Sequence, residues 1–232
     1  MPRMGAAAAV FCLLAFSAAP AIEARPRPFT SKEQFYGLFH MHLQRSPDSF
    51  VENIYWLERA LGAEFANPLH ALALIETEIQ WEKYRYLFMM HLNVKMAEQH
   101  LFLGGMWSRR RAHFFNAPWR EQNLASLEIA EAVFGMAMHY WEEAQRWAAL
   151  ARDRRFRFVD LPRVQFWADS AYRIETGELD YGRTIRRELA TLMRARERFE
   201  EMPPRDPPRL PPPPLFPWEP WEPWESGWGF RN

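Results

Sequence analysis

The stretch HYWEEAQRWAALA, residues 139–151, decides the fold class because its aromatic and small residues recur at helical spacing. Trp141, Ala144 and Ala148 are three and four positions apart, so they lie on one face of an α-helix. The two adjacent glutamates then point away from that face, which favours helix packing over a pair of catalytic acids. The residues that we expect to pack here are Trp141, Ala144, Trp147, Ala148 and Ala151.

On both sides of this stretch the chain runs far without a residue that breaks helices. Residues 119–152 contain one interruption, Gly135, and residues 69–103 contain neither proline nor glycine. The range 69–103 predicts one long helix, or two joined without a breaker, with Gly104 and Gly105 as the stop. Two long helices of similar length predict an antiparallel pair.

Shorter helices are expected around this pair. Ser31 has the character of a helix cap, and Ser46 and Asn67 each precede a proline, the pattern of a first helical turn. Pro162 opens a further helix that ends before Gly177, and a last helix follows. No pair of segments alternates with the period of β-strands. The sequence therefore predicts an all-α fold, with antiparallel helical hairpins forming an elongated bundle.

Two segments are similar to the tetratricopeptide repeat, a helix pair in which large and small residues alternate so that the helices nest. YWEEAQRWAALA resembles the second helix of such a repeat. FWADSAYRIETGELDYGRTI resembles a first helix, a turn and a second helix, with Gly177 at the turn and Gly182 at a small packing position. The resemblance implies a degenerate tetratricopeptide-like array as an alternative to a simple bundle.

The chain as a whole resembles small periplasmic helical proteins of spirochaetes that build the collar around periplasmic flagellar motors. The segments that carry this resemblance are NPLHALALIETEIQWEKYRYLFMMHLNVKM and PWREQNLASLEIAEAVFGMAMHYWEEA. The resemblance implies a scaffold whose partners are flagellar-motor or other envelope proteins. It implies no catalytic residues.

The N-terminus, residues 1–24, has the pattern of a secretory signal peptide. Arg3 precedes an apolar run, and small residues follow at Ala21 and Ala24, where we expect cleavage. A retained membrane anchor is the alternative, although the apolar run is short for a bilayer span. The sequence thus predicts export to the periplasm, with the helical domain occupying residues 25–202.

Residues 203–232 change abruptly to a proline-rich composition, in which Trp-Glu recurs at Trp218, Trp221 and Trp224. Proline lacks the amide donor and restricts its neighbours, so we expect a disordered or polyproline-like tail. The tail is either low-complexity sequence without a function or a docking peptide whose spaced aromatics suit a groove on a partner.

The charge pattern bears on the class of partner. The formal net charge is zero, which argues against nucleic acid as a partner. Arg109, Arg110 and Arg111 form a local basic run that suits planar contacts with the carboxylates of an acidic protein. A second run, residues 152–157, has the same chemistry, and solvated loops balanced by glutamates are the simpler interpretation of both.

Motifs of catalysis and of cofactor or small-molecule binding are absent from the sequence: there is no phosphate-binding glycine loop, nucleophile elbow or zinc-protease motif. The alternative function is a copper carrier that uses the soft ligands Met41, His42 and His91. Methionine more often fills gaps in a core. The sequence therefore favours an exported, non-enzymatic scaffold or adaptor that binds other proteins and carries no cofactor.

Overall fold

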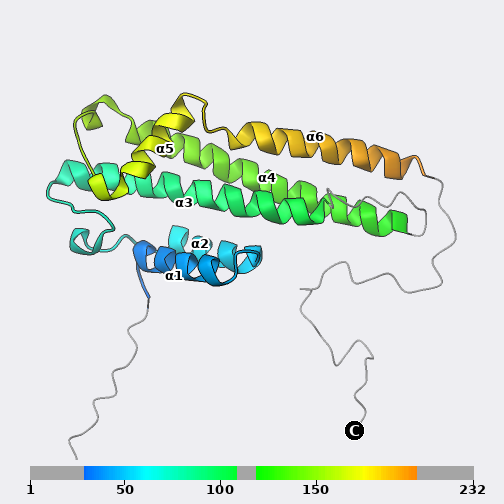
Figure 1. Ribbon diagram of the computed structural model, residues 1–232, viewed down its shortest axis with the longest axis horizontal. Coiled ribbons are helices and arrows are strands. Elements are labelled where there is room, and N and C mark those ends of the chain that lie inside the picture. The colour runs from blue at the N-terminus through cyan, green and yellow to red at the C-terminus, as the bar shows by residue number, and fades with distance from the viewer. Residues whose placement is uncertain (1–28, 109–118, 203–232) are drawn as a thin grey trace, which may run out of the picture.

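The computed structural model describes residues 29–108 and 119–202, and it confirms the all-α prediction (Figure 1). The described residues contain no β-strand, and their single isolated bridge joins Ser31 to Glu64. The α-helices are α1 (Lys32–Arg45), α2 (Phe50–Gly62), α3 (Glu78–Trp107), α4 (Arg120–Ala151), α5 (Gln165–Glu175) and α6 (Tyr181–Glu200). Within the described residues, short 3-10 helices also occur: η1 (Pro68–His70), η3 (Arg154–Phe156) and η4 (Pro162–Val164).

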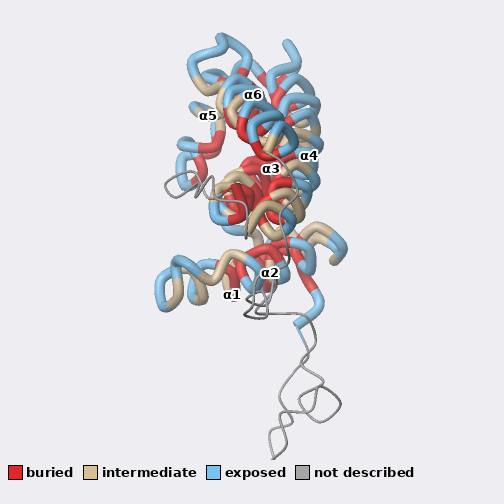
Figure 2. Tube along the Cα trace, turned by 90° about the vertical axis from the view of Figure 1, so that its right-hand side faces the viewer, coloured by how far each residue is buried: buried red, intermediate tan, exposed pale blue. Residues whose placement is uncertain are grey.

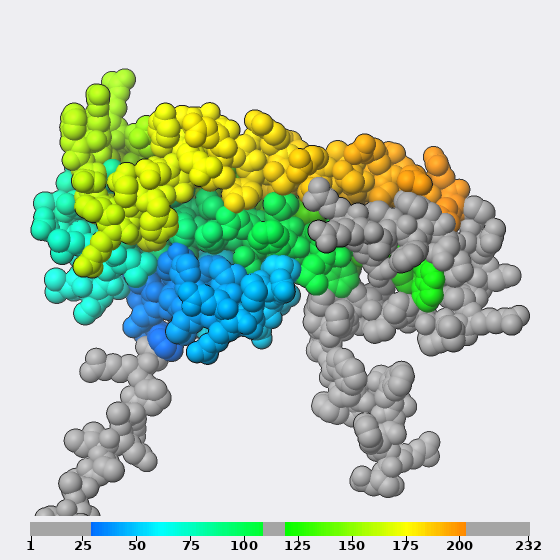
Figure 3. Space-filling view, in the orientation of Figure 1, coloured from blue at the N-terminus to red at the C-terminus, as the bar shows by residue number. Residues whose placement is uncertain are grey.

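The two longest helices, α3 and α4, form an antiparallel pair along the molecule (Figure 1). Ser126 Oγ, early in α4, donates to the carbonyl of Trp107 at the end of α3 over 2.5 Å. At the opposite end, Lys83 Nζ in α3 donates to the carbonyl of Phe156, just beyond α4, over 3.3 Å. The hairpin of α1 and α2 covers one side of α3, and α6 covers α4 (Figures 1 and 3).

The central helix α3 is enclosed on most of its circumference, as the tube coloured by burial shows (Figure 2). Trp167 of α5 lies at the centre of the core, with its ring centroid 5.2 Å from that of Phe88 and 5.1 Å from that of His91. Helix α4 is apolar on one face, where Trp141, Ala144, Ala148 and Ala151 are buried. Among the described residues, no helix is long and apolar enough to cross a membrane.

The prediction for residues 69–103 was wrong at both ends. Helix α3 begins at Glu78, because Thr77 and Gln80 form a capping box that satisfies the first backbone amides. Before it, Asn67 caps only the short η1. Helix α3 also passes through the predicted glycine stop and ends at Trp107.

Gly104 is a packing contact and not a helix terminus. A Cβ atom at this position would lie 2.5 Å from Cε1 of Phe134, so only glycine lets α3 approach α4 this closely. The prediction for Ser46 was also wrong, since α2 begins at Phe50. The Ser46 amide instead ends α1 by donating to the backbone carbonyl of His42 over 2.8 Å.

The remaining predicted helix ends lie near the observed ones. Ser31 and Gln34 form a capping box at the start of α1. Gly177 lies in the turn between α5 and α6 with φ of 75°, a left-handed conformation that glycine adopts without strain. The segment YWEEAQRWAALA lies in the C-terminal part of the continuous helix α4, without a turn before it.

Candidate functional site

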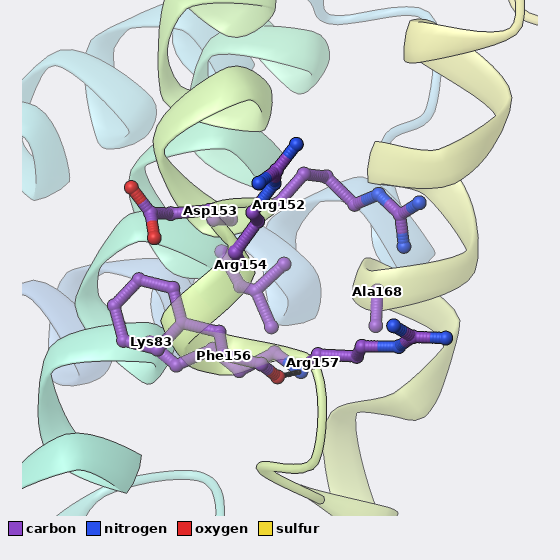
Figure 4. A pocket seen from close by; sticks show the side chains of 9 residues that line it. Lys83, Arg152, Asp153, Arg154, Phe156, Arg157 and Ala168 are labelled. Atoms are coloured by element: carbon purple, nitrogen blue, oxygen red, sulfur yellow. Dashed lines mark hydrogen bonds between the residues drawn. The ribbon is translucent and has the colours of Figure 1, made fainter.

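A cavity of about 290 Å³ opens at the end of the molecule where α4 terminates, beside α3 and α5 (Figure 4). We call it the cationic cavity. Its apolar lining comes from Leu87, Ala151, Phe156 and Ala168. Its charged lining comes from Lys83, Arg152, Asp153, Arg154 and Arg157. The charged lining thus contains four basic side chains and one acidic side chain.

The loop that forms this cavity follows α4 and projects at one end of the molecule (Figure 3). Phe156 anchors the loop, because its ring is buried and packs edge-on against Tyr86 at a centroid distance of 5.9 Å. Lys83 Nζ holds the same loop by donating to the carbonyls of Phe156 and Val159 over 3.3 and 2.6 Å. The basic side chains are therefore presented from a backbone that is fixed at several points.

Two of the loop arginines are engaged within the protein. Arg155 Nη2 lies 2.8 Å from Oε1 of Glu82 on α3, and Arg152 Nε lies 2.7 Å from Oε2 of Glu175 on α5. The Arg152 guanidinium also lies over the ring of Tyr172, 5.3 Å from its centroid. These contacts tie the loop to its neighbours and leave less of their charge for a ligand.

Arg154 and Arg157 differ from them, since neither forms an ion pair within the part of the chain that the structure describes. Both side chains are exposed. The Arg157 guanidinium lies 5.5 Å from the ring centroid of Phe158, which is 91% exposed. Figure 4 shows Arg157 extending toward Ala168 of α5, while the carboxylate of Asp153 points away from the guanidinium groups.

The charged lining of the cavity is predominantly basic. Burial lowers the pKa of Lys83, the Asp160 carboxylate opposes this shift, and the Arg152 charge lowers the pKa further. The Asp153 carboxylate is already used, because its Oδ1 accepts the Arg155 amide over 2.9 Å. A carboxylate entering the cavity would find unpaired guanidinium donors.

The three residues of the alternative copper site lie on two helices, Met41 and His42 on α1 and His91 on α3. Met41 is 49% exposed on α1. His42 is engaged by Asn53 Oδ1 at 2.8 Å and by Glu52 at 2.7 Å. His91 is buried among aromatic rings, with its Nε2 atom 2.6 Å from the hydroxyl of Tyr36. Within residues 29–108 and 119–202, no group of three histidine, cysteine or acidic side chains has the geometry to hold a metal ion.

The predicted packing residues lie in the interior or at its edge, except Gly177, which is exposed in the turn between α5 and α6. Trp147 is half-buried, and its ring centroid lies 5.9 Å from that of Tyr86. Gly182 of α6 lies directly against Trp141 of α4, where an added Cβ atom would come within 2.8 Å of Nε1 of that indole. Gly182 and Trp141 thus belong to the contact between α4 and α6.

Several predicted features lie outside the described residues. They are the signal peptide at residues 1–24, the contact residues Arg109, Arg110 and Arg111, and the tail with Trp218, Trp221 and Trp224. Sequence reasoning missed Lys83 and Phe156 as parts of a site, although the chain has only two other lysines, Lys32 and Lys95. The rarity of lysine beside many arginines was the one available signal for Lys83.

The fold and the cavity define a class: an all-helical protein with a predominantly basic cavity at one end of its central helix pair. The chain belongs to the family described as Domain of unknown function (DUF8513), which matches residues 79–202, more than half of its 232 residues. The matched range covers the helices α3 to α6 and the whole cationic cavity. No curated protein and no solved structure matches the chain.

Proposed function

We propose that the protein is an exported, non-enzymatic helical scaffold that binds an acidic segment of another envelope protein in the cationic cavity. The observation that carries this proposal is the pair Arg154 and Arg157, which are exposed on an anchored loop and form no ion pair with any described residue. Guanidinium groups present a planar fork that matches a carboxylate, and they stack on aromatic faces. An acidic segment that also contains an aromatic residue would use both properties.

The anchoring of the loop supports binding at this site. A loop that is already ordered loses little conformational entropy when a ligand arrives, so more of the interaction energy contributes to affinity. Phe156 and Lys83 provide this order from the core side. A surface ion pair alone contributes little, but several donors around a half-enclosed cavity act on a carboxylate that is partly removed from water.

The sequence supports the class of partner. The N-terminal pattern favours export, and the resemblance to flagellar collar proteins favours a place in a motor collar or in another envelope assembly. The packing of α4 against α3 and α6 supplies a rigid body about as long as its longest helix, which suits a spacer between partners.

The proposal is tested by affinity capture from the envelope fraction of the source cells, with the full chain as bait. The Arg154→Ala/Arg157→Ala variant is compared with Arg187→Ala/Arg194→Ala, which removes the same charge from exposed positions of α6. We expect a partner identified by mass spectrometry to be retained by the control and reduced about 10-fold or more by the cavity variant, as for the loss of two charge-assisted hydrogen bonds. Equal recovery with both variants contradicts binding at this cavity.

A further inference from the structure

We propose that, before a partner binds, the cationic cavity is occupied in cis by the Trp-Glu-Pro segment of the chain's own tail, residues 216–226. This inference rests on the proposed function, because it names a competitor for the same cavity. Its three supports are the charges of the two parts, the exposed aromatic contact beside the cavity, and the distance that the chain has to cover.

The charges of the two parts are complementary. The segment FPWEPWEPWES carries three glutamates and no basic residue. The cavity lining carries four basic side chains and Asp153, whose carboxylate is turned away and hydrogen-bonded to the loop. Arg154 and Arg157 form no ion pair with described residues, so they are available to the glutamates of the tail.

The aromatic chemistry also matches. The cavity edge already shows an arginine against a solvent-exposed ring, at Arg157 and Phe158. Indole is the preferred partner for such a cation. In a left-handed polyproline helix, which has three residues per turn, a Trp-Glu-Pro repeat would present its tryptophans along one edge and its glutamates along the next. Both ligand types therefore reach the cavity from one extended segment.

The length of the tail fits the distance between its origin and the cavity. The C-terminal end of α6 lies beside the start of α4, because Arg120 Nε donates to the carbonyl of Phe199 over 2.8 Å. The cavity lies at the other end of α4, whose 32 residues extend about 48 Å at ~1.5 Å per residue. A polyproline chain with the length of residues 203–218 would span about 50 Å at ~3.1 Å per residue. The tail is therefore long enough to bring its first Trp-Glu pair to the cavity.

Competition with a soluble peptide tests this occupancy. A fluorescent peptide with the sequence of residues 216–226 is titrated with the full chain and with its Trp218→Ala/Trp221→Ala/Trp224→Ala variant, and binding is followed by fluorescence anisotropy. A tethered segment competes at an effective concentration near the millimolar range. We therefore expect the affinity of the peptide for the tail variant to be at least about 10-fold higher than its affinity for the unchanged protein.

The control arms locate the binding site and separate the two proposals. In the tail variant, adding Arg154→Ala/Arg157→Ala should abolish peptide binding, and adding Arg187→Ala/Arg194→Ala should leave it unchanged. If the peptide binds the unchanged protein and the tail variant equally, but only with the cavity arginines present, the cis occupancy is overturned while the cavity remains a binding site. If no form binds the peptide, the cis occupancy is overturned, and the scaffold proposal is judged by the capture experiment alone.

A tail that docks on a second copy is also distinguished. Docking in trans would produce oligomers whose mass rises with concentration in light scattering and falls in the tail variant. That outcome overturns occupancy in cis. A monomer at all concentrations, together with the weakened peptide binding, supports it.

Discussion

The contact between α3 and α4 at Gly104 predicts a specific cost for the smallest possible side chain. In Gly104→Ala, the new Cβ atom would lie 2.5 Å from Cε1 and 2.6 Å from Cδ1 of Phe134. Carbon atoms that are not bonded to one another prefer about 3.5–4.0 Å. The Phe134 ring is fully buried, so it has no free space to move into, and the helices have to separate or the ring has to leave its preferred rotamer.

The adjacent residue supplies a matched control. Gly105 lies in the same turn of α3, and a Cβ atom there would meet nothing within 4 Å. Both replacements gain the same helix propensity, at most about 1 kcal/mol. Overpacking in a core costs about 1–3 kcal/mol. We therefore expect Gly104→Ala to be about 1–3 kcal/mol less stable than Gly105→Ala, with the propensity gain cancelling between them.

The measurement is equilibrium unfolding of the full chain in urea, followed by far-ultraviolet circular dichroism and by tryptophan fluorescence. Coincident transitions show that a single free energy of unfolding applies. For a domain of this size, each kcal/mol also shifts the melting temperature by about 2–4 °C. Equal stabilities, or a more stable Gly104→Ala, would refute the close approach of the two long helices.

Three further outcomes are expected. At the contact of α6 with α4, Gly182→Ala should destabilise the protein by about 1–3 kcal/mol, because the new Cβ atom overlaps Trp141. Gly135→Ala, whose Cβ atom would meet nothing within 4 Å, should not destabilise it. Urea unfolding of the two variants compares their free energies of unfolding. Burial lowers the pKa of His91 from 6.5 to about 3, so below pH 6.5 the unfolded state binds a proton that the folded state does not. The free energy of unfolding should therefore fall by about 2 kcal/mol between pH 7 and pH 5, and by less in the His91→Gln variant. Lys83→Met leaves two loop carbonyls without their donor. Residues 152–159 should therefore exchange their amide hydrogens faster than in the unchanged protein, whereas exchange at the centre of α3 should stay the same. Unchanged exchange in the loop would contradict the anchoring role of Lys83.

The helices were predictable where one local pattern decides the structure. The face through Trp141, Ala144 and Ala148 and the absence of breakers were sufficient for α4, which ends within a residue of the expected position. Gly177 was predictable because a left-handed turn residue has few alternatives to glycine. These signals lie within a few residues of the feature that they determine.

The errors arose where distant contacts decide the structure. Residues 69–77 contain no helix-breaking residue, yet they are not part of α3. The Leu72 amide donates to the hydroxyl of Tyr84, and the capping box starts α3 at Glu78. Gly104 resembled a stop because glycine is common there, but its reason is Phe134, 30 positions later in the sequence. Propensity cannot reveal a contact of this kind.

The cationic cavity was only half visible for the same reason. The arginine run after α4 is plain in the sequence, but Lys83 meets that loop across 73 and 76 positions. The sequence also could not show which arginines are neutralised. The pairs of Arg155 with Glu82 and of Arg152 with Glu175 depend on how α3 and α5 flank the loop. Arg154 and Arg157 have no such ion pair within the described residues.

Lysine and arginine have different roles at the loop after α4. The ammonium group is a compact charge with three donors, which suits backbone carbonyls, whereas the guanidinium fork suits carboxylates and rings. Lys32 donates to the carbonyls of Ala60 and Leu61 at the end of α2, and Lys83 likewise donates to backbone carbonyls of the loop after α4. Lysine holds the loop backbone, and Arg152 and Arg155 tie the loop to α5 and α3. Arg154 and Arg157 form no ion pair with described residues, so their planar groups remain at the surface, where the proposed acidic, aromatic segment would reach them.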